Sequence, residues 1–312
     1  MKQEHELNIT AIELTLDFYS PEEELFLPLF KEKQVRVFVK RDDLIHPFIS
    51  GNKWRKLKYA LISAKENKQD TLVTFGGAWS NHLLATACAG AMFGFNTIGF
   101  VRGESVSNPV LAMCKLYGME LVFVTRTEYK HKTDLFLQRF ESGSNALFID
   151  EGGYGPHGMR GCSEIIAELK HAYNHIFCAA GTGTTLAGLA TGISDHKLEH
   201  TQLHGVPVLK GGAFIETEMK NLTAPIQQLT LHTDYHFGGY AKTTPELFHF
   251  IQEFVSKTGM MIEPVYTGKL FYALHDLINK NTFSPDDKIL LLHTGGLTGF
   301  LGMYEEFTSL NI

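Results

Sequence analysis

Short apolar runs alternate with longer helix-compatible stretches along most of this chain, and this alternation restricts the folds that it can form. A strand followed by a helix and another strand favours a parallel sheet with right-handed crossover connections. We therefore predict an α/β fold built on mostly parallel sheets flanked by helices. Strands are expected at 35–39, 71–75, 96–101, 120–124, 146–149, 175–179, 205–209 and 288–293. Helices are expected at 52–65, 81–93, 108–117, 133–142, 162–173, 245–257 and 269–278.

A glycine-rich passage at 151–161, EGGYGPHGMRG, interrupts the alternation and is the predicted crossing between two domains. The 312 residues give room for two domains, because a domain has about 150 residues. We expect residues 51–159 to form a small α/β domain. It is inserted into a larger α/β domain built from both ends of the chain, residues 1–50 and 160–312.

Composition excludes several classes of function. The chain is 44% hydrophobic, which is too apolar for a disordered protein, and no uncharged stretch is apolar enough to span a bilayer. Its formal net charge of −6 argues against nucleic acid or an anionic membrane as the main partner. The N-terminus lacks a secretory signal, so a cytoplasmic location is expected. Four scattered cysteines show no metal-ligand or disulfide spacing and are expected to be buried thiols: Cys88, Cys114, Cys162 and Cys178.

Lys53 lies where a glycine-containing turn enters a predicted helix. The positive end of a helix dipole disfavours the charged form of a lysine. A lysine that loses its proton readily can form a Schiff base with a carbonyl compound. The alternative is a solvated basic face, because Arg55, Lys56 and Lys58 belong to the same helix.

Two glycine-containing turns follow predicted strands. The first, GGAWSNH at 76–82, places Ser80 and Asn81 beside free backbone N–H groups and suits a carboxylate or a phosphate; an ordinary N-cap is the alternative. The second, GTGTTLAG at 181–188, suits a phosphate, because glycines let the backbone approach an anion and threonines add donors. Its spacing excludes dinucleotide-binding and P-loop motifs, and a non-binding turn is the alternative.

Three C-terminal segments add candidate residues: Gly239-Tyr240, EPVYTGK at 263–269 and HTGG at 293–296. Tyr266 and Thr294 each lie beside glycines at the edge of a strand or turn, where side chains face a cleft. A structural tyrosine and an N-cap threonine are the alternatives.

Together these segments resemble the family of pyridoxal-phosphate enzymes that contains 1-aminocyclopropane-1-carboxylate deaminase and D-cysteine desulfhydrase. The resemblance rests on RDDL…GNKWRKL, GGAWSNH, GTGTTLAG, EPVYTGK and HTGG, in the family's order, and covers nearly the whole chain. It implies a two-domain tryptophan-synthase-β-like fold, pyridoxal 5'-phosphate as cofactor, a small amino acid as substrate, no metal, and a homodimer.

The resemblance also implies a role for each candidate residue. Lys53 would bind the cofactor covalently and remove the α-proton, Asn81 would bind the cofactor's phenolic oxygen, and Thr294 would contact the pyridine nitrogen. The implied phosphate ligands are Gly181, Thr182, Gly183, Thr184 and Thr185. The implied substrate contacts are Ser80, Asn81, His82, Tyr240, Tyr266 and Thr267, with Lys53, Ser80, Tyr240 and Tyr266 taking part in catalysis.

Thr267 distinguishes two activities within the resembled family. The cyclopropane-opening enzymes have a glutamate at this position, whereas the desulfhydrase-like members have threonine, so the site would offer hydroxyls and no carboxylate. The predicted activity is therefore D-cysteine desulfhydrase, which forms pyruvate, sulfide and ammonia. The alternatives are 1-aminocyclopropane-1-carboxylate deaminase and a non-catalytic protein that binds a small ligand. Trp54 and Trp79 depart from the family's usual residues and predict a narrower pocket or a different substrate.

Overall fold

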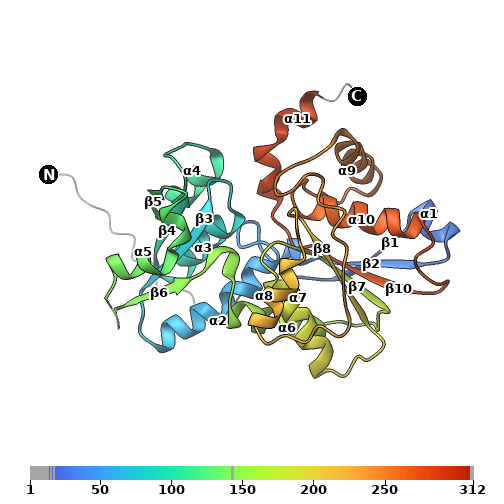
Figure 1. The fold of residues 1–312 in the computed structure, drawn as a ribbon, viewed down its shortest axis with the longest axis horizontal. Coiled ribbons are helices and arrows are strands. Elements are labelled where there is room, and N and C mark those ends of the chain that lie inside the picture. Colours follow the sequence, from blue (N-terminus) through green and yellow to red (C-terminus); the bar gives the residue numbers. More distant parts are fainter. Residues whose placement is uncertain (1–13, 15, 17, 142–143, 310–312) are drawn as a thin grey trace.

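Two separate sheets form the framework of the structure, a computed structural model that describes residues 14, 16, 18–141 and 144–309 (Figure 1). The strands of the smaller sheet are β3 (Thr71–Gly77), β4 (Asn96–Arg102), β5 (Glu120–Val124) and β6 (Ala146–Ile149). They are all parallel, in the order β5-β4-β3-β6. The strands of the larger sheet are β1 (Glu22–Leu25), β2 (Arg36–Lys40), β7 (His175–Ala180), β8 (Gln202–Pro207), β9 (Leu229–Leu231) and β10 (Lys288–Leu292). Their order is β1-β2-β10-β7-β8-β9, with β1 antiparallel to β2 and the other pairs parallel.

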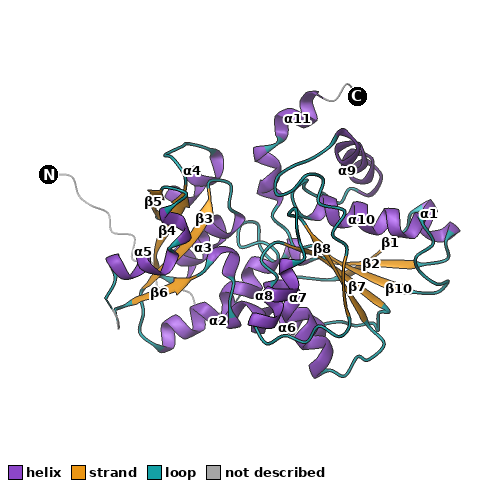
Figure 2. Cartoon of the chain, viewed as in Figure 1, coloured by secondary structure: helices purple, strands orange, loops and turns teal. Residues whose placement is uncertain are grey.

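Helices pack around both sheets, because parallel strands are apolar on both faces (Figure 2). The helices near the smaller sheet are α2 (Asn52–Glu66), α3 (Asn81–Phe93), α4 (Pro109–Leu116) and α5 (Lys132–Arg139). The helices near the larger sheet are α1 (Pro28–Glu32), α6 (Pro156–Ala167), α7 (Thr184–Asp195), α8 (Phe214–Asn221), α9 (Pro245–Thr258), α10 (Thr267–Asn279) and α11 (Tyr304–Ser309). Short 3₁₀ turns are η1 (Asp42–Leu44), η2 (Glu128–Lys130), η3 (Glu151–Gly153) and η4 (Leu297–Gly302).

Helices α2, α6 and α7 connect the two halves of the molecule. Apolar side chains of α2 belong to a core with the smaller sheet, while those of α6 and α7 belong to a core with the larger sheet. Glycines allow these helices to approach closely. A Cβ at Gly161 would lie 1.8 Å from the carbonyl oxygen of Arg55, and one at Gly188 would lie 2.6 Å from that of Met159. Gly161 therefore allows α6 to pack directly against the backbone of α2.

The structure confirms most of the elements predicted from periodicity. The helix at 81–93 and the strands at 120–124 and 146–149 have the predicted bounds. All four cysteines are buried. No helix in the part of the chain that the structure describes is long and apolar enough to cross a membrane. The expectations for residues 1–13, and for the predicted helix end at 142, lie outside the described residues, and the domain limits at 51 and 159 stay a prediction.

Two predicted elements are shifted along the chain, and six observed helices and strands were not predicted: α1, α7, α8, α11, β1 and β9. The helix expected at 162–173 begins at Pro156 and ends at Ala167, because the glycines of that segment pack against other helices instead of forming a loop. The strand expected at 205–209 spans Gln202–Pro207. Strand β1, with the sequence EEEL, was not predicted, because its glutamates lack an apolar pattern.

Candidate active site

Lys53 lies in the first turn of α2. This helix begins after Gly51, which has a φ of 62° and packs so closely on Thr294 that a Cβ would overlap its carbonyl oxygen at 1.7 Å. The Nζ of half-buried Lys53 donates a hydrogen bond of 2.8 Å to Asn52 Oδ1. Burial, together with the positive charge of Lys56, lowers the pKa of Lys53 to about 7. We expected the helix dipole to have this effect, and burial is the larger cause.

The lowered pKa of Lys53 predicts a pH-dependent stability. Between pH 7 and 10.5 the unfolded chain binds more protons at this lysine than the folded chain does, so the free energy of unfolding rises with pH in that range. Lys53→Met removes this titration. In urea unfolding of the protein freed of any bound ligand, we expect the variant to be more stable than the original protein near pH 7, with the difference shrinking toward pH 10. A difference that is constant with pH would contradict the lowered pKa.

Residues 181–185, here called the loop at 181–185, comprise the turn after β7 and the first two residues of α7, and they include all five predicted phosphate ligands. Gly183 has a φ of 82°, a conformation that favours glycine. The side-chain amide of Asn52 donates a hydrogen bond of 3.0 Å to Thr185 Oγ1, which joins the starts of α2 and α7. The first N–H groups of α7 have no partner within the helix. The loop therefore presents donors for an anion close to Lys53.

Lys53 and Asn81 line the same pocket, whose volume is about 310 Å³ including solvent at its mouth. The amide of Asn81 donates a hydrogen bond of 3.3 Å to Gly296 O, and Thr298 donates its hydroxyl proton to Asn81 Oδ1. Asn81 thus connects the start of α3 to the segment after β10. The lining residues are Pro47, Phe48, Ser50, Lys53, Asn81, Gly296, Leu297 and Thr298.

Ser80, Trp54 and Trp79 were also singled out from the sequence. Ser80 Oγ accepts a hydrogen bond of 3.3 Å from Leu83 N, so Ser80 is the N-cap of α3. Trp54 is buried against Phe93, with ring centroids 5.8 Å apart, and Trp79 lies against Gly302. Neither tryptophan lines the pocket that contains Lys53.

His82, a predicted substrate contact, is buried with 2% of its surface exposed. Thr74 donates its hydroxyl proton to Ile149 O, so its oxygen accepts from His82 Nε2 at 2.9 Å. His82 Nδ1 is buried and has no hydrogen-bond partner in the described part of the chain. Burial, and then the charges of Lys53 and Lys56, hold the pKa of His82 well below its usual value. His82 is therefore a neutral ring with one free acceptor.

Tyr266 and Tyr240 lie together near the glycine–threonine loop. Their ring centroids are 6.0 Å apart at an angle of 73°. A Cβ on Gly181 would lie 3.2 Å from the Tyr266 ring, so this ring rests against the loop. Tyr240 is 45% exposed. Burial, and then its contact with Tyr240, raises the pKa of Tyr266 well above its usual value, so this hydroxyl keeps its proton.

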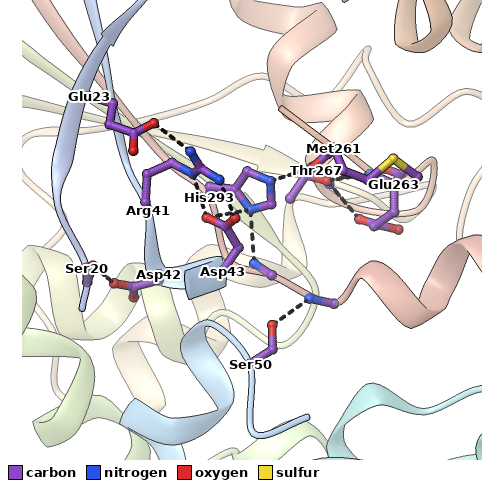
Figure 3. Close-up of polar contacts among 12 residues, drawn as sticks. Ser20, Glu23, Arg41, Asp42, Asp43, Ser50, Met261, Glu263, Thr267 and His293 are labelled. Atoms are coloured by element: carbon purple, nitrogen blue, oxygen red, sulfur yellow. Dashed lines mark hydrogen bonds and ion pairs between the residues drawn. The ribbon is translucent and has the colours of Figure 1, made fainter. Parts of the chain in front are cut away.

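Thr267 does not have the surroundings that we expected. Its side chain is fully buried, and its hydroxyl lies 3.2 Å from Glu263 Oε1 at the start of α10 (Figure 3). The same hydroxyl accepts a hydrogen bond of 2.8 Å from Glu263 N. Thr267 is therefore part of a capping arrangement, and a direct substrate contact finds no support in this geometry. The expectation that the site offers a ligand hydroxyls and no carboxylate stays a prediction, because the carboxylate of buried Glu263 accepts from the backbone of this turn.

Thr294 lies between His293 and the close contact with α2. His293 Nε2 donates to Met261 O at 2.8 Å, and its Nδ1 accepts from Gly295 N at 3.2 Å (Figure 3). Thr294 O accepts from Asn52 N at 3.3 Å. Within the described residues, the Thr294 hydroxyl has no hydrogen-bond partner. This hydroxyl is thus available to a ligand beside Lys53.

Three polar residues of the site were not among the predicted ones: Asn52, Lys56 and Glu263. Lys56 was assigned to a possible solvated face, yet it is 6% exposed and donates to Gly152 O at 3.0 Å. It follows Lys53 by three residues, a spacing that places both on one face of a helix. That spacing could have identified Lys56, whereas the position of Asn52 opposite Thr185 depends on the tertiary fold.

Comparison with known proteins identifies the class to which this site belongs. Residues 24–295 match the family described as pyridoxal-phosphate dependent enzyme. A protein of Pyrococcus horikoshii, provisionally named 1-aminocyclopropane-1-carboxylate deaminase, is 32% identical over 303 residues, which cover 91% of this chain and 92% of that protein. The chain therefore belongs to the pyridoxal-phosphate-dependent enzymes. Within this class it belongs to the family of 1-aminocyclopropane-1-carboxylate deaminase and D-cysteine desulfhydrase.

Further relatives agree with the predicted family and fold. An Arabidopsis thaliana protein named bifunctional D-cysteine desulfhydrase/1-aminocyclopropane-1-carboxylate deaminase, mitochondrial, is 28% identical over 303 residues, covering 88% of this chain and 75% of that protein. The crystal structure of an ACC deaminase homologue superposes with a TM-score of 0.84 at 29% identity, covering 97% of both chains. A fungal L-serine ammonia-lyase from Rhizomucor miehei has a TM-score of 0.68 at 18% identity, covering 94% of this chain and 98% of that one, and shares the fold. The predicted fold class is confirmed.

Proposed function

We propose that the protein is a pyridoxal-phosphate-dependent lyase that releases ammonia from a small amino acid, and that D-cysteine is its substrate. D-cysteine and water would give pyruvate, sulfide and ammonia. The observation behind this proposal is Lys53, a half-buried lysine with a pKa of about 7. It lies beside an anion-binding loop, in a family defined by its use of this cofactor.

The residues around Lys53 fit pyridoxal phosphate. The loop at 181–185 would bind the phosphate with its backbone N–H groups and threonine hydroxyls. Buried Lys56 has no carboxylate partner among the described residues and would add a positive charge. The free hydroxyl of Thr294 would contact the pyridine nitrogen. Asn81 retains an unused donor and lone pair for the phenolic oxygen.

Gly183→Asp should weaken cofactor binding. The substitution places a negative charge at the proposed phosphate site and a side chain at a φ of 82°. We expect the affinity for pyridoxal phosphate to fall at least about tenfold, or about 1.4 kcal/mol, in a titration followed by visible absorbance. Gly183→Ala is the control, because it introduces the backbone strain without the charge. An unchanged titration of Gly183→Asp would place the phosphate elsewhere.

Pyridoxal phosphate, when bound, withdraws electrons from the α-carbon of the substrate and makes its C–H bond acidic. Lys53, with a pKa of about 7, is then suited to accept the α-proton as a general base. Ser80 and the free N–H groups at the start of α3 would hold the substrate carboxylate. The protonated hydroxyls of Tyr240 and Tyr266 would donate to the leaving sulfur.

Two substrates compete within this proposal. The provisional name of the Pyrococcus horikoshii relative favours 1-aminocyclopropane-1-carboxylate, and the Arabidopsis relative is named for both reactions. Thr267 favours D-cysteine, because the resembled ring-opening enzymes have a glutamate there. Thr267 is fully buried, with its hydroxyl 3.2 Å from Glu263 Oε1. Sulfide is also a better leaving group than a ring carbon.

Substrate preference is the direct test. We expect kcat/KM for D-cysteine to exceed that for 1-aminocyclopropane-1-carboxylate at least about a hundredfold, a difference of about 2.7 kcal/mol in transition-state stabilisation. Purified holoenzyme is assayed with D- and L-amino acids and the cyclopropane substrate, measuring 2-oxo acid and sulfide in parallel. Comparable release of 2-oxobutyrate from the cyclopropane substrate would establish the second candidate instead.

Two further points belong to the proposal. A non-catalytic binding protein would lack visible absorbance from a lysine-linked cofactor, whereas we expect the purified protein to be yellow.

We also propose a homodimer, as the family resemblance implies. Light scattering should then give twice the 35.0 kDa of one chain.

A further inference from the structure

Two fully buried ionisable side chains lie near the paired tyrosines: Glu263 precedes α10, and Lys269 belongs to its first turn. We propose that Glu263 and Lys269 are positioning residues: Glu263 orients Tyr266 through the backbone of this turn, and Lys269 orients Tyr240 through the loop that precedes it. This inference rests on the proposed function, in which both tyrosines face the substrate. It adds that Glu263 and Lys269 together hold the two tyrosine side chains in position.

The Glu263 carboxylate binds the backbone on either side of Tyr266. Its Oε1 accepts from Tyr266 N and Thr267 N, each at 2.7 Å, and its Oε2 accepts from Val265 N at 2.7 Å. The Thr267 hydroxyl lies 3.2 Å from Oε1. A carboxylate has about four lone-pair sites, and the three backbone donors alone occupy three of them. A glutamine could offer only one carbonyl oxygen, and its amide N–H would oppose a backbone N–H.

The Lys269 ammonium holds the loop before Tyr240. Its Nζ donates to Gly239 O at 2.8 Å, to His236 O at 2.9 Å and to Val208 O at 3.4 Å. These three bonds use all three ammonium donors. Gly239 is bonded directly to Tyr240 in the chain, so this anchor lies one residue from the tyrosine.

The anchored loop has an unfavourable backbone conformation. Phe237 and Ala241 have φ values of 50° and 51°, a region that side chains other than glycine rarely adopt. Gly238 and Gly239 have φ values of 95° and 126°. Such conformations persist only where the surrounding structure imposes them. The ammonium of Lys269 contacts this loop and can impose this conformation on it.

The two anchors act on a single pair of rings. Lys269 lies two residues after Thr267, in the same helical turn. This turn therefore connects Lys269, which holds the loop before Tyr240, to the backbone that Glu263 binds around Tyr266. The rings meet with centroids 6.0 Å apart. The competing explanation is that both ions only stabilise the core of the larger sheet. In that case their removal would loosen the whole sheet and would not act through the tyrosines.

Hydrogen exchange in the full-length holoenzyme separates these explanations without relying on turnover. For Glu263→Gln we expect the amides of 265–267 to exchange at least about tenfold faster, and for Lys269→Met those of 238–242, with β7 and β8 unchanged. Lys280→Met is the matched control, because Lys280 lies at the other end of α10 and is exposed. Faster exchange throughout the larger sheet, or none in these segments, would overturn the proposal. If Glu263→Gln does not fold, Thr267→Val removes one donor to the same carboxylate and should accelerate 265–267 alone.

Double-mutant cycles then test whether the ions act through the tyrosines. We expect Lys269→Met to lower kcat/KM about a hundredfold with cofactor absorbance retained, and to have less than about a threefold effect once Tyr240→Phe is present. Glu263→Gln should behave in the same way toward Tyr266→Phe. Additive effects would overturn the proposal. Full turnover by both tyrosine variants would instead refute the proposed substrate role of the tyrosines, and the exchange result would still decide the positioning.

Discussion

Lys53→Ala should abolish turnover while leaving the protein folded. Only an amine can form the covalent link to the cofactor, and the same amine is the proposed base, so no other group replaces either role. General base catalysis alone contributes about 10²- to 10⁴-fold, and we expect a loss of at least about a thousandfold. The visible absorbance of the cofactor should disappear as well. Circular dichroism and thermal unfolding would show that the fold is retained.

Lys65→Ala provides the control, because Lys65 is exposed in the last turn of the same helix. It should keep both absorbance and turnover. Borohydride reduction of the original holoenzyme, followed by peptide mapping, should place the cofactor on Lys53. A label on Lys56 or Lys269, the other buried lysines near the site, would overturn the assignment.

Arg55→Leu should destabilise the protein by about 3–5 kcal/mol, because it leaves a buried carboxylate without its partner. Arg55 Nε and Nη2 donate to the two oxygens of Asp42 at 2.8 and 2.7 Å, and both side chains are almost completely buried. Arg55 also donates to Glu168 at 2.6 and 2.9 Å. After the substitution, Asp42 keeps the hydroxyl of Ser20 as a side-chain donor (Figure 3). Urea unfolding would measure the loss.

An exposed pair of the same geometry provides the comparison. Arg36 donates to both oxygens of Glu24 at 2.8 and 2.7 Å, but about half of its side chain is exposed. Arg36→Leu should therefore cost at most about 1 kcal/mol. Adding Asp42→Asn to Arg55→Leu should recover part of the lost stability, because the unpaired charge is removed. A cost for Arg55→Leu as small as that for Arg36→Leu would show that Asp42 is solvated.

The sequence predicted those elements whose patterns are local. Helix α3 has apolar residues from Leu83 onward, a serine cap and a terminal glycine, and its predicted bounds agree with the structure. Helix α6 was misplaced because Gly158 and Gly161 usually indicate a loop. In this fold they allow a helix to contact Lys56 and the backbone of Arg55, neighbours that no local pattern reveals.

The residues of the candidate site also divide into those that a local pattern predicts and those that depend on tertiary contacts. The loop at 181–185 and Lys53 could be identified from short motifs, because backbone donors and amines have the same chemistry in most settings. The resemblance implied a substrate contact for Thr267, and a short motif does not reveal where such a side chain points. Its hydroxyl serves Glu263, and the partner of Asn52 lies 133 residues away in the sequence.

The position of β10 has a consequence for how the chain is made. This strand, near the end of the chain, lies between β2 and β7, so two earlier strands cannot pair with their permanent neighbour until residues 288–292 leave the ribosome. The smaller sheet, by contrast, is built from the continuous segment 71–149 and can form during synthesis. During translation, the edges of β2 and β7 are therefore open to non-native pairing. Nascent chains arrested before residue 288 should accordingly engage chaperones more than released chains do.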